Sequence, residues 1–397
     1  MKFAHLSDCH LGAWSNHPEL RELPVRAFEK AMNTCMKEKV DFILIAGDLF
    51  DTSLPPIDIL KSTVTKLREC SQAGISVYII AGSHDFSPTG KTMISVLEEA
   101  GLLINVAKAD IEEKISLKFS YDRSGALITG LFGKKNALES VYFENLEEIE
   151  KKEGFKIFLF HSAITEFKPE HLKEMPSIPL SLLPKNFDYY ASGHVHEKFF
   201  SEKYKLAFPG ALFPTNFQEL EKYDSGFLII DVADNDILHR WVSVKLLDVE
   251  LFDIDAKNRS PQELENEIIE KMEGRTVKNK IVLIKMRGIL KNGNPSDIDF
   301  RKIFSFAYQS GAKAVKKNIS RLKSHEFEEI KIGHSMHIEE IEKKLIEEHL
   351  GQIEFIGDEK EMIFSLMDIL KEQQEEGENL SSFQERIKEN TNKILGF

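Results

Sequence analysis

Short clusters of aspartate and histidine, each directly after an apolar run that is typical of a β-strand, constrain this chain more than any other feature. In chain order they are Asp8-Cys9-His10, Gly47-Asp48-Leu49-Phe50-Asp51, Gly82-Ser83-His84-Asp85, His161 and Gly193-His194-Val195-His196. Each cluster therefore lies in a loop at the carboxyl end of a strand, the edge at which open α/β sheets gather ligands. Side chains at i and i+2 both face a site when the loop leaves the strand's pleat.

Alternating strand and helix patterns fill the first 245 residues. β-branched and aromatic runs predict strands over residues 2–6, 41–46, 75–81, 126–131, 156–160, 188–191 and 226–232. Apolar residues at helical spacing predict helices over 25–37, 57–67 and 93–103. This alternation predicts an α/β domain over residues 1–245.

The pattern changes after Val249. A helix over 261–272 after a Ser260 cap, a strand over 280–285 and a helix over 298–308 predict a small α+β domain over residues 246–325. A charge-rich linker or helix follows over 326–360, and two amphipathic helices over 361–397. Ser382 and Glu385 predict a capping box for the last helix.

Net charge, cysteine count and the lack of long apolar runs exclude several classes of protein. The net charge of −13 disfavours a chain coated by nucleic acid, unless a local basic track or bound metal ions supply positive charge. Three cysteines without CxxC spacing argue against a disulfide scaffold and a structural zinc site. The chain has no long apolar run, so we expect a cytoplasmic, nucleoid-associated protein with no signal peptide or membrane span.

Carboxylate and imidazole ligands together suit Mn²⁺, Fe²⁺ or Zn²⁺. The number of aspartates and histidines exceeds the needs of one ion, and two ions bridged by a carboxylate clamp the oxygens of a phosphoryl displacement. Asp48 is the candidate bridge. Each motif alone also fits ordinary turn or core chemistry, since Gly-Asp is common in turns. Their joint occurrence in this order favours the metal site.

The series D-x-H, GD, G-N-H-D/E, H and G-H-x-H is the signature of calcineurin-like metallophosphoesterases, which this chain resembles. Residues 5–12 (HLSDCHLG), 41–50 (DFILIAGDLF) and Phe208-Pro209-Gly210 are similar to the DNA double-strand-break repair nucleases called SbcD in bacteria and the meiotic-recombination-eleven nuclease in archaea and eukaryotes. The resemblance is strong over residues 1–245 and weaker beyond. It implies a β-sandwich flanked by helices, a small α+β capping domain and C-terminal helices.

The resemblance also implies roles for residues. One metal would be held by Asp8, His10, Asp48 and His196, and a second by Asp48, His161 and His194. The expected cofactors are two Mn²⁺ per chain, with Mg²⁺, Fe²⁺ or Zn²⁺ as alternatives. His84 matches the family's catalytic histidine, which stabilises charge or protonates the leaving oxygen.

Two positions depart from the family pattern. Ser83 stands where the family has an asparagine that ligates the second metal; a serine hydroxyl is shorter and a poorer ligand, so either a water intervenes or the second site is weak. Asp51 stands where many archaeal and eukaryotic relatives have a histidine thought to orient the catalytic one. We expect Asp51 and Asp85 to support the site from behind the ligands.

The implied function is a manganese-dependent nuclease subunit of a double-strand-break repair complex. It would be a 3′–5′ exonuclease on duplex ends and an endonuclease on single strands or hairpins. The implied partners are DNA, an ABC-type coiled-coil ATPase of the SbcC or Rad-fifty family on the C-terminal helices, and a second copy of the chain. The basic residues either contact DNA phosphates or belong to the solvent-exposed surface. They are Lys134, Lys135, Lys316, Lys317 and Arg321.

Two alternatives stay open. The first is another phosphoesterase of this fold, acting on a phosphomonoester or a cyclic nucleotide; the long segment after Val249 argues against it, since a minimal phosphatase would not need it. The second is a DNA-end-binding scaffold with weakened catalysis, which Ser83 alone favours.

Overall fold

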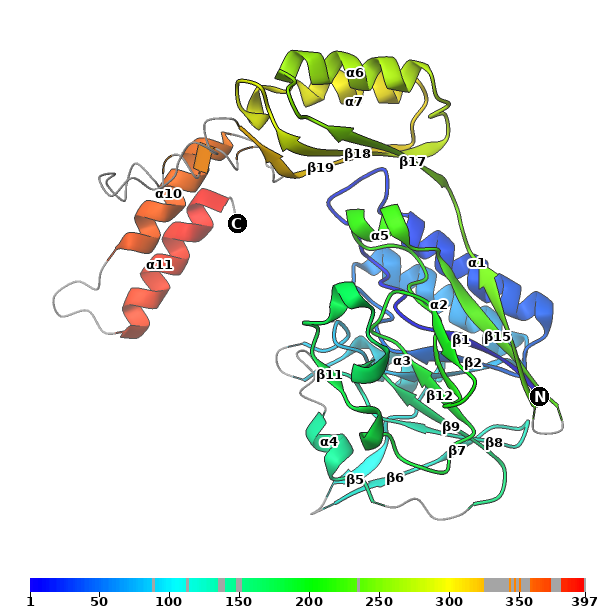
Figure 1. Cartoon of the computed structure of the whole chain (residues 1–397). Coiled ribbons are helices and arrows are strands. Elements are labelled where there is room, and N and C mark those ends of the chain that lie inside the picture. Colours follow the sequence, from blue (N-terminus) through cyan, green and yellow to red (C-terminus); the bar gives the residue numbers. More distant parts are fainter. Residues whose placement is uncertain are drawn as a thin grey trace. The chain divides into compact units, whose positions relative to one another are not determined.

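The computed structural model describes residues 1–87, 90–111, 114–134, 140–147, 152–233, 236–324, 343, 346–347, 350, 358–372 and 380–395. The chain divides into two compact units, Met1–Leu247 and Asp248–Phe397 (Figure 1). Each unit contains its own buried apolar cluster. No helix in the described ranges has both the length and the apolar character needed to cross a bilayer.

Two six-stranded mixed sheets form the first unit, with strand orders β16-β15-β1-β2-β3-β4 and β13-β14-β12-β9-β8-β7. The first contains β1 (Lys2–Leu6), β2 (Phe42–Ala46), β3 (Ser76–Ile80), β4 (Ile104–Asn105), β15 (Gly226–Ala233) and β16 (Asp236–Ser243). The second contains β7 (Ser120–Tyr121), β8 (Ala126–Gly130), β9 (Phe155–Phe160), β12 (Tyr189–Ser192), β13 (Phe199–Ser201) and β14 (Leu206–Phe208). Small two-stranded sheets are made by β5 (Ala109–Ile111) with β6 (Ile115–Leu117), and by β10 (Ala163–Ile164) with β11 (Ser177–Ile178).

The sheets share a core made from both. Leu44 of β2, Ile128 of β8, Ile157 of β9 and Tyr189 of β12 all lie in one buried cluster. Because the central strands contribute buried side chains to this cluster, they read as nearly continuous apolar runs in the sequence. The expected sandwich with flanking helices is therefore confirmed.

The helices of the first unit are α1 (Leu23–Glu38), α2 (Ile57–Gln72), α3 (Met93–Glu99), α4 (Ser140–Glu144) and α5 (Phe217–Lys222). Helix α1 buries Ala27, Phe28, Ala31 and Cys35, which recur at helical spacing. It packs beside α2, which contacts β3 (Figure 1). Periodicity alone thus located the main helices of this unit.

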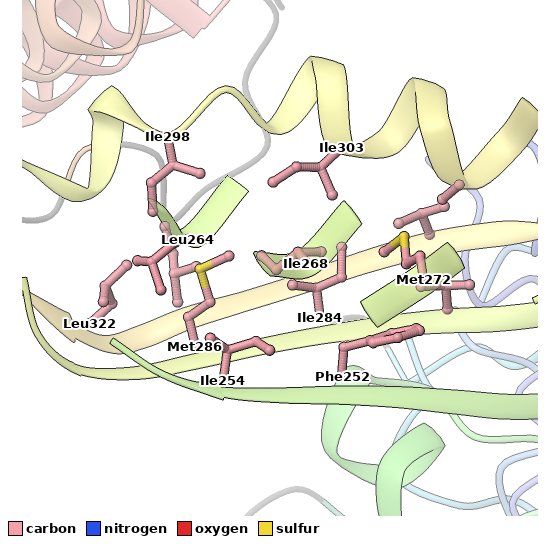
Figure 2. Close-up of a cluster of buried hydrophobic side chains, with 14 of the residues drawn as sticks. Phe252, Ile254, Leu264, Ile268, Met272, Ile284, Met286, Ile298, Ile303 and Leu322 are labelled. Atoms are coloured by element: carbon pink, nitrogen blue, oxygen red, sulfur yellow. The ribbon is translucent and has the colours of Figure 1, made fainter. Parts of the chain in front are cut away.

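The second unit begins with a sheet of three parallel strands, β17 (Asp248–Asp255), β18 (Lys280–Ile289) and β19 (Ala314–Lys323). Helices α6 (Pro261–Glu273) and α7 (Phe300–Gln309) pack on one face of this sheet, and Figure 2 shows their apolar side chains, including Ile268 and Ile303, meeting Ile284. The predicted Ser260 cap is present as a capping box with Glu263. The expected small domain of helices and strands is present, and its strands are all parallel and alternate with the helices.

The C-terminal segment contains α10 (Glu359–Lys371) and α11 (Leu380–Leu395), which contact each other (Figure 1). The predicted capping box at Ser382 is wrong, because α11 already begins at Leu380 and Ser382 lies inside the helix. Most of the linker expected over 326–360 lies outside the described residues.

Candidate metal centre

The aspartate and histidine clusters follow neighbouring strands. Asp8 and His10 follow β1, Asp48 follows β2, and His84 follows β3 in the first sheet. His161 follows β9, and the Gly193–His196 segment follows β12, in the second sheet. Strands β1, β2 and β3 run parallel, as do β9 and β12, and β2 contacts both β9 and β12. The carboxyl ends of these strands therefore meet at one place.

The backbone of several of these residues adopts an unusual conformation. Asp8, His10, Asp48 and His194 have φ angles of 49°, 42°, 51° and 80°, in the left-handed region that non-glycine residues rarely occupy. Hydrogen bonds between the loops hold this conformation: the Asp8 amide donates to Gly47 O at 3.1 Å, and the His10 amide to Asp48 O at 3.0 Å. Such strain clusters at functional sites, where the surrounding structure enforces it.

Side-chain ligand atoms converge in three overlapping groups. The groups are Asp8-His10-His196, His10-Asp48-His84 and Asp8-Asp48-His161, and within each the ligand atoms lie within 4.8 Å of one another. Asp8 is 0% exposed, while Asp48 and His161 are each 2% exposed. A buried set of carboxylate and imidazole groups this dense is consistent with a divalent metal site.

The imidazoles of His10 and His196 form an arrangement that is consistent with a bound cation. Their Nε2 atoms lie 3.1 Å apart. His196 Nδ1 donates to Glu219 Oε1 at 2.9 Å, and His10 Nδ1 lies 3.2 Å from Asp51 Oδ1. With a proton on each Nδ1, the two Nε2 lone pairs face each other, an arrangement that a shared cation stabilises.

His161 is oriented in a similar way from the other sheet. Its Nδ1 donates to the Ala46 carbonyl at 2.8 Å, which turns Nε2 toward Asp48 Oδ2 at 3.1 Å. Burial lowers the pKa of His161, but the Asp48 and Asp8 carboxylates outweigh this and raise the pKa to about 10. The position therefore favours positive charge. Gly47 has a φ of +87°, and a Cβ there would overlap the His161 ring.

His194 and Ser83 lie beside this arrangement. The His194 ring packs edge-on against His161 with centroids 5.2 Å apart, and the His194 amide donates to Asp8 Oδ1 at 3.0 Å. Burial lowers the pKa of His194 to about 4, which leaves a neutral imidazole. The Ser83 hydroxyl donates to Asp48 Oδ2 at 3.4 Å. Among the described residues, the His194 imidazole does not belong to the three groups of converging histidine and carboxylate atoms.

His84 is exposed at the edge of the cluster. Its amide donates to Asp48 Oδ1 at 2.8 Å, and its Nδ1 donates to the Asp51 carbonyl at 2.8 Å. The ring also packs edge-on against His10 with centroids 4.8 Å apart. A backbone carbonyl orients the ring, so the replacement of the family's histidine by Asp51 does not remove this contact.

Asp85 links the loop after β2 to the loop after β3 through hydrogen bonds. Its buried carboxylate accepts hydrogen bonds from the amides of Gly82 at 2.9 Å, Phe50 at 3.0 Å and Leu49 at 3.3 Å. Burial and the nearby Asp48 raise its pKa to about 7. The Asp85 carboxylate thus accepts hydrogen bonds from the backbone of both loops.

Sequence reasoning missed Glu219. This residue of α5 is 9% exposed and contacts His196 through Oε1, while Oε2 accepts from the Thr215 amide at 2.8 Å. Burial raises the pKa of Glu219, but the hydrogen bond and charge of His196 and the hydrogen bonds from Thr215 together outweigh this and lower the pKa to about 2. The only sequence signal is Asn216, which caps α5 three residues earlier and reveals a helix start without a role for Glu219.

The basic candidates belong to both units of the chain. Lys134 follows β8 and donates to the Tyr142 hydroxyl at 2.8 Å, whereas Lys135 lies outside the described residues. Lys316 and Lys317 are adjacent on β19, so their side chains point to opposite faces of the sheet. The Lys317 ammonium lies 4.3 Å from the centroid of the Phe300 ring. The exposed Arg321 is also on β19, where it lies opposite Arg287 of β18 in the strand register.

The sequence is similar to proteins of a phosphoesterase family. Residues 1–198 match the family described as calcineurin-like phosphoesterase. The chain is 26% identical over 374 residues (89% of this chain and 82% of the relative) to the DNA double-strand break repair protein Mre11 of Archaeoglobus fulgidus. It is 23% identical over 375 residues (90% and 93%) to the protein of the same name from Methanococcus maripaludis. It is 28% identical over 258 residues (61% and 60%) to the uncharacterized metallophosphoesterase YhaO of Bacillus subtilis. With the sandwich fold and the buried cluster, these matches show that the chain belongs, through its first 198 residues, to the calcineurin-like phosphoesterase family.

Proposed function

We propose that this protein is a metal-dependent DNA phosphodiesterase, a nuclease that acts at DNA double-strand breaks. The observation that carries the proposal is the convergence of buried imidazole and carboxylate atoms, above all the His10 and His196 nitrogens 3.1 Å apart. The similarity to Mre11 proteins, which extends over 89% of the chain for the Archaeoglobus relative, supports DNA as the substrate.

The metals would be two Mn²⁺ ions, with Mg²⁺, Fe²⁺ or Zn²⁺ as alternatives. One set of ligands would be Asp8, His10, Asp48 and His196, and the other Asp48, His161, His194 and, directly or through a water, Ser83. Divalent ions in such a site polarise a phosphoryl oxygen and activate water near neutral pH. The protein's own contribution is a rigid, buried ligand set.

His84 would be the catalytic acid. Its Nδ1 is fixed by the Asp51 carbonyl at 2.8 Å, so its other nitrogen remains available to a group that arrives at the exposed edge of the cluster. There it would stabilise or protonate the leaving oxygen. An imidazole suits this role because it exchanges protons near neutral pH.

The wider assembly is also proposed. Activities would include 3′–5′ exonuclease cleavage of duplex ends and endonuclease cleavage of single strands and hairpins. Residues 1–245 would form the nuclease domain, 246–325 a DNA-facing cap, 326–360 a linker, and 361–397 the docking segment for an ABC-type coiled-coil ATPase, within a homodimer. Because the net charge is −13, DNA binding would depend on the metals and local basic residues and would weaken steeply with salt.

The test compares end-labelled linear duplex DNA with a small chromogenic phosphodiester, each with Mn²⁺, Mg²⁺ or EDTA. We expect Mn²⁺-dependent shortening of the DNA that EDTA abolishes. Hydrolysis of the small diester without cleavage of duplex, single-stranded or hairpin DNA would instead favour a phosphoesterase with another substrate. DNA binding without hydrolysis of either substrate would favour an end-binding scaffold.

A further inference from the structure

Three aromatic rings and one lysine form a cluster that we name the aromatic platform: Phe86, Phe132, Tyr142 and Lys134. Phe86 lies in the loop after β3, Phe132 and Lys134 lie in the loop after β8, and Tyr142 belongs to α4. The Phe86 and Phe132 centroids lie 5.4 Å apart, and those of Phe132 and Tyr142 lie 5.3 Å apart, both pairs edge to face. All four side chains are partly exposed. The rings therefore contact one another and solvent.

The Lys134 ammonium is fixed on these rings. Its Nζ lies 2.8 Å from the Tyr142 hydroxyl, 4.6 Å from the Tyr142 ring centroid and 5.5 Å from that of Phe132. Cation–π attraction and the hydrogen bond both restrict a side chain that is otherwise flexible. The platform thus combines aromatic surface with one positioned positive charge.

The platform adjoins the metal centre through both of its loops. Phe86 is two residues beyond His84 in the same loop. Gly133, between Phe132 and Lys134, donates its amide to the Ala81 carbonyl at 2.9 Å, and a Cβ at Gly133 would lie 2.8 Å from His161 Cβ. The segment that carries the platform therefore lies directly against a buried ligand of the centre.

Aromatic surface with a positive charge is the chemistry that binds single-stranded nucleic acid. Every base has a π-face, so stacking holds any base without reading its sequence, while a lysine contacts phosphate. Within a duplex both faces of a base are covered by its neighbours. We propose that the aromatic platform binds an unpaired nucleobase of the strand being cleaved and so positions the adjacent phosphodiester at the metal centre.

This proposal rests on the proposed nuclease function and adds to it a requirement for a separated strand at the site. The variants are Phe132→Ala and Phe132→Leu, the second keeping an apolar side chain without a π-face, and Lys134→Met. The matched control is Tyr121→Ala on β7, where the aromatic side chain is 69% exposed. Thermal unfolding of each variant shows that it is folded.

The first readout is kcat/KM on a single-stranded oligonucleotide and on one with an abasic spacer beside the scissile bond. Loss of stacking on one base predicts that both Phe132 variants lower kcat/KM roughly 5- to 100-fold on the normal strand. The same variants should have little effect on the abasic strand, and Tyr121→Ala should match the wild type on both. Lys134→Met should reduce the salt dependence of binding by about one charge.

The second readout does not need cleavage. A DNA strand with 2-aminopurine at its terminal position is bound in the presence of Mg²⁺ to two proteins. One is the His84→Ala variant, and the other is the double variant that carries both His84→Ala and Phe132→Leu. Stacking should quench the fluorescence of the first complex, and loss of the ring should restore it. Equal fluorescence in both complexes, or equal losses of kcat/KM on normal and abasic strands, would overturn the platform while leaving the nuclease intact. A wild-type protein that neither binds nor cleaves DNA would overturn both proposals.

Discussion

The two halves of the metal centre differ in how their imidazoles are supported. In the Asp8 half (Asp8, His10 and His196), the Glu219 carboxylate accepts a hydrogen bond from His196 at 2.9 Å. His10 Nδ1 lies 3.2 Å from Asp51 Oδ1 but forms no hydrogen bond with it. In the His161 half (His161, His194 and Ser83), His161 is backed by a neutral backbone carbonyl at 2.8 Å. Because a carboxylate partner raises the basicity of a ligating imidazole, the Asp8 half should bind a divalent cation more tightly. The expected difference in cation affinity between the halves therefore comes from the hydrogen-bond partners of the imidazoles and not only from the number of ligands.

The largest effect is expected from Asp48, which contacts both halves. Asp48→Asn should remove the shared charge, abolish binding of at least one ion and lower DNA cleavage about 10³-fold or more, since bound metals supply several kcal/mol to the transition state. Manganese content by elemental analysis and the cleavage rate check this. Asp122→Asn is the control, because Asp122 is also buried and accepts a hydrogen bond from Tyr78. Full manganese content in Asp48→Asn would contradict the shared position.

Removal of His84 should separate catalysis from metal binding. His84→Ala keeps the amide that donates to Asp48 and loses only the ring, so manganese content should stay at the wild-type level. Cleavage should fall about 10²- to 10⁴-fold, the usual range for a lost general acid. A variant that lost its metal together with its activity would show that His84 is a ligand instead.

Glu219 tests the support of the Asp8 half. Glu219→Gln should weaken Mn²⁺ binding to that half about 10- to 100-fold, because the hydrogen bond to His196 Nδ1 loses its charge. Calorimetric titration measures the affinity, and Glu221→Gln on the same helix is the matched control. If Glu219→Gln binds Mn²⁺ as the wild type does, the carboxylate is not what makes this half stronger.

Substitution of Ser83 by asparagine should have the smallest effect, and it should strengthen Mn²⁺ binding where the substitutions above weaken it or leave it unchanged. Ser83→Asn introduces an amide oxygen next to Asp48 and should strengthen the His161 half, so that cleavage saturates at several-fold lower Mn²⁺. Ser83→Ala removes the hydroxyl and should shift saturation the other way. Identical Mn²⁺ dependence in all three proteins would place Ser83 outside the second site.

Local pattern predicted much of the fold. The apolar runs at β1, β2 and β9 lie inside the sandwich, where nearly every side chain is buried, so the sequence signal is strong. Strands β16 and β19 are among those that the sequence pattern did not predict. Strand β16 alternates between exposed and partly buried residues, and β19 carries four lysines and arginines over ten positions, so neither forms an apolar run in the sequence.

The site was predictable only as far as its motifs extend. Asp8, His10 and His161 follow strands and are recognisable from sequence, but the partner of His196 is Glu219, which comes from a separate helix. His5 begins the family-like stretch of residues 5–12, yet it does not belong to the metal cluster. It is fully buried and hydrogen-bonded to Tyr189 and Ser192, and burial lowers its pKa to about 3. Long-range pairing of this kind leaves no local pattern.

Calorimetric titration of the metal-stripped protein with Mn²⁺ tests the central claim most directly. Two ions per chain are expected, one bound clearly more tightly than the other, with Glu219→Gln weakening the tighter phase and Ser83→Asn strengthening the weaker one. Absence of Mn²⁺ binding, or two phases that neither substitution changes, would contradict a centre built from two unequally supported halves.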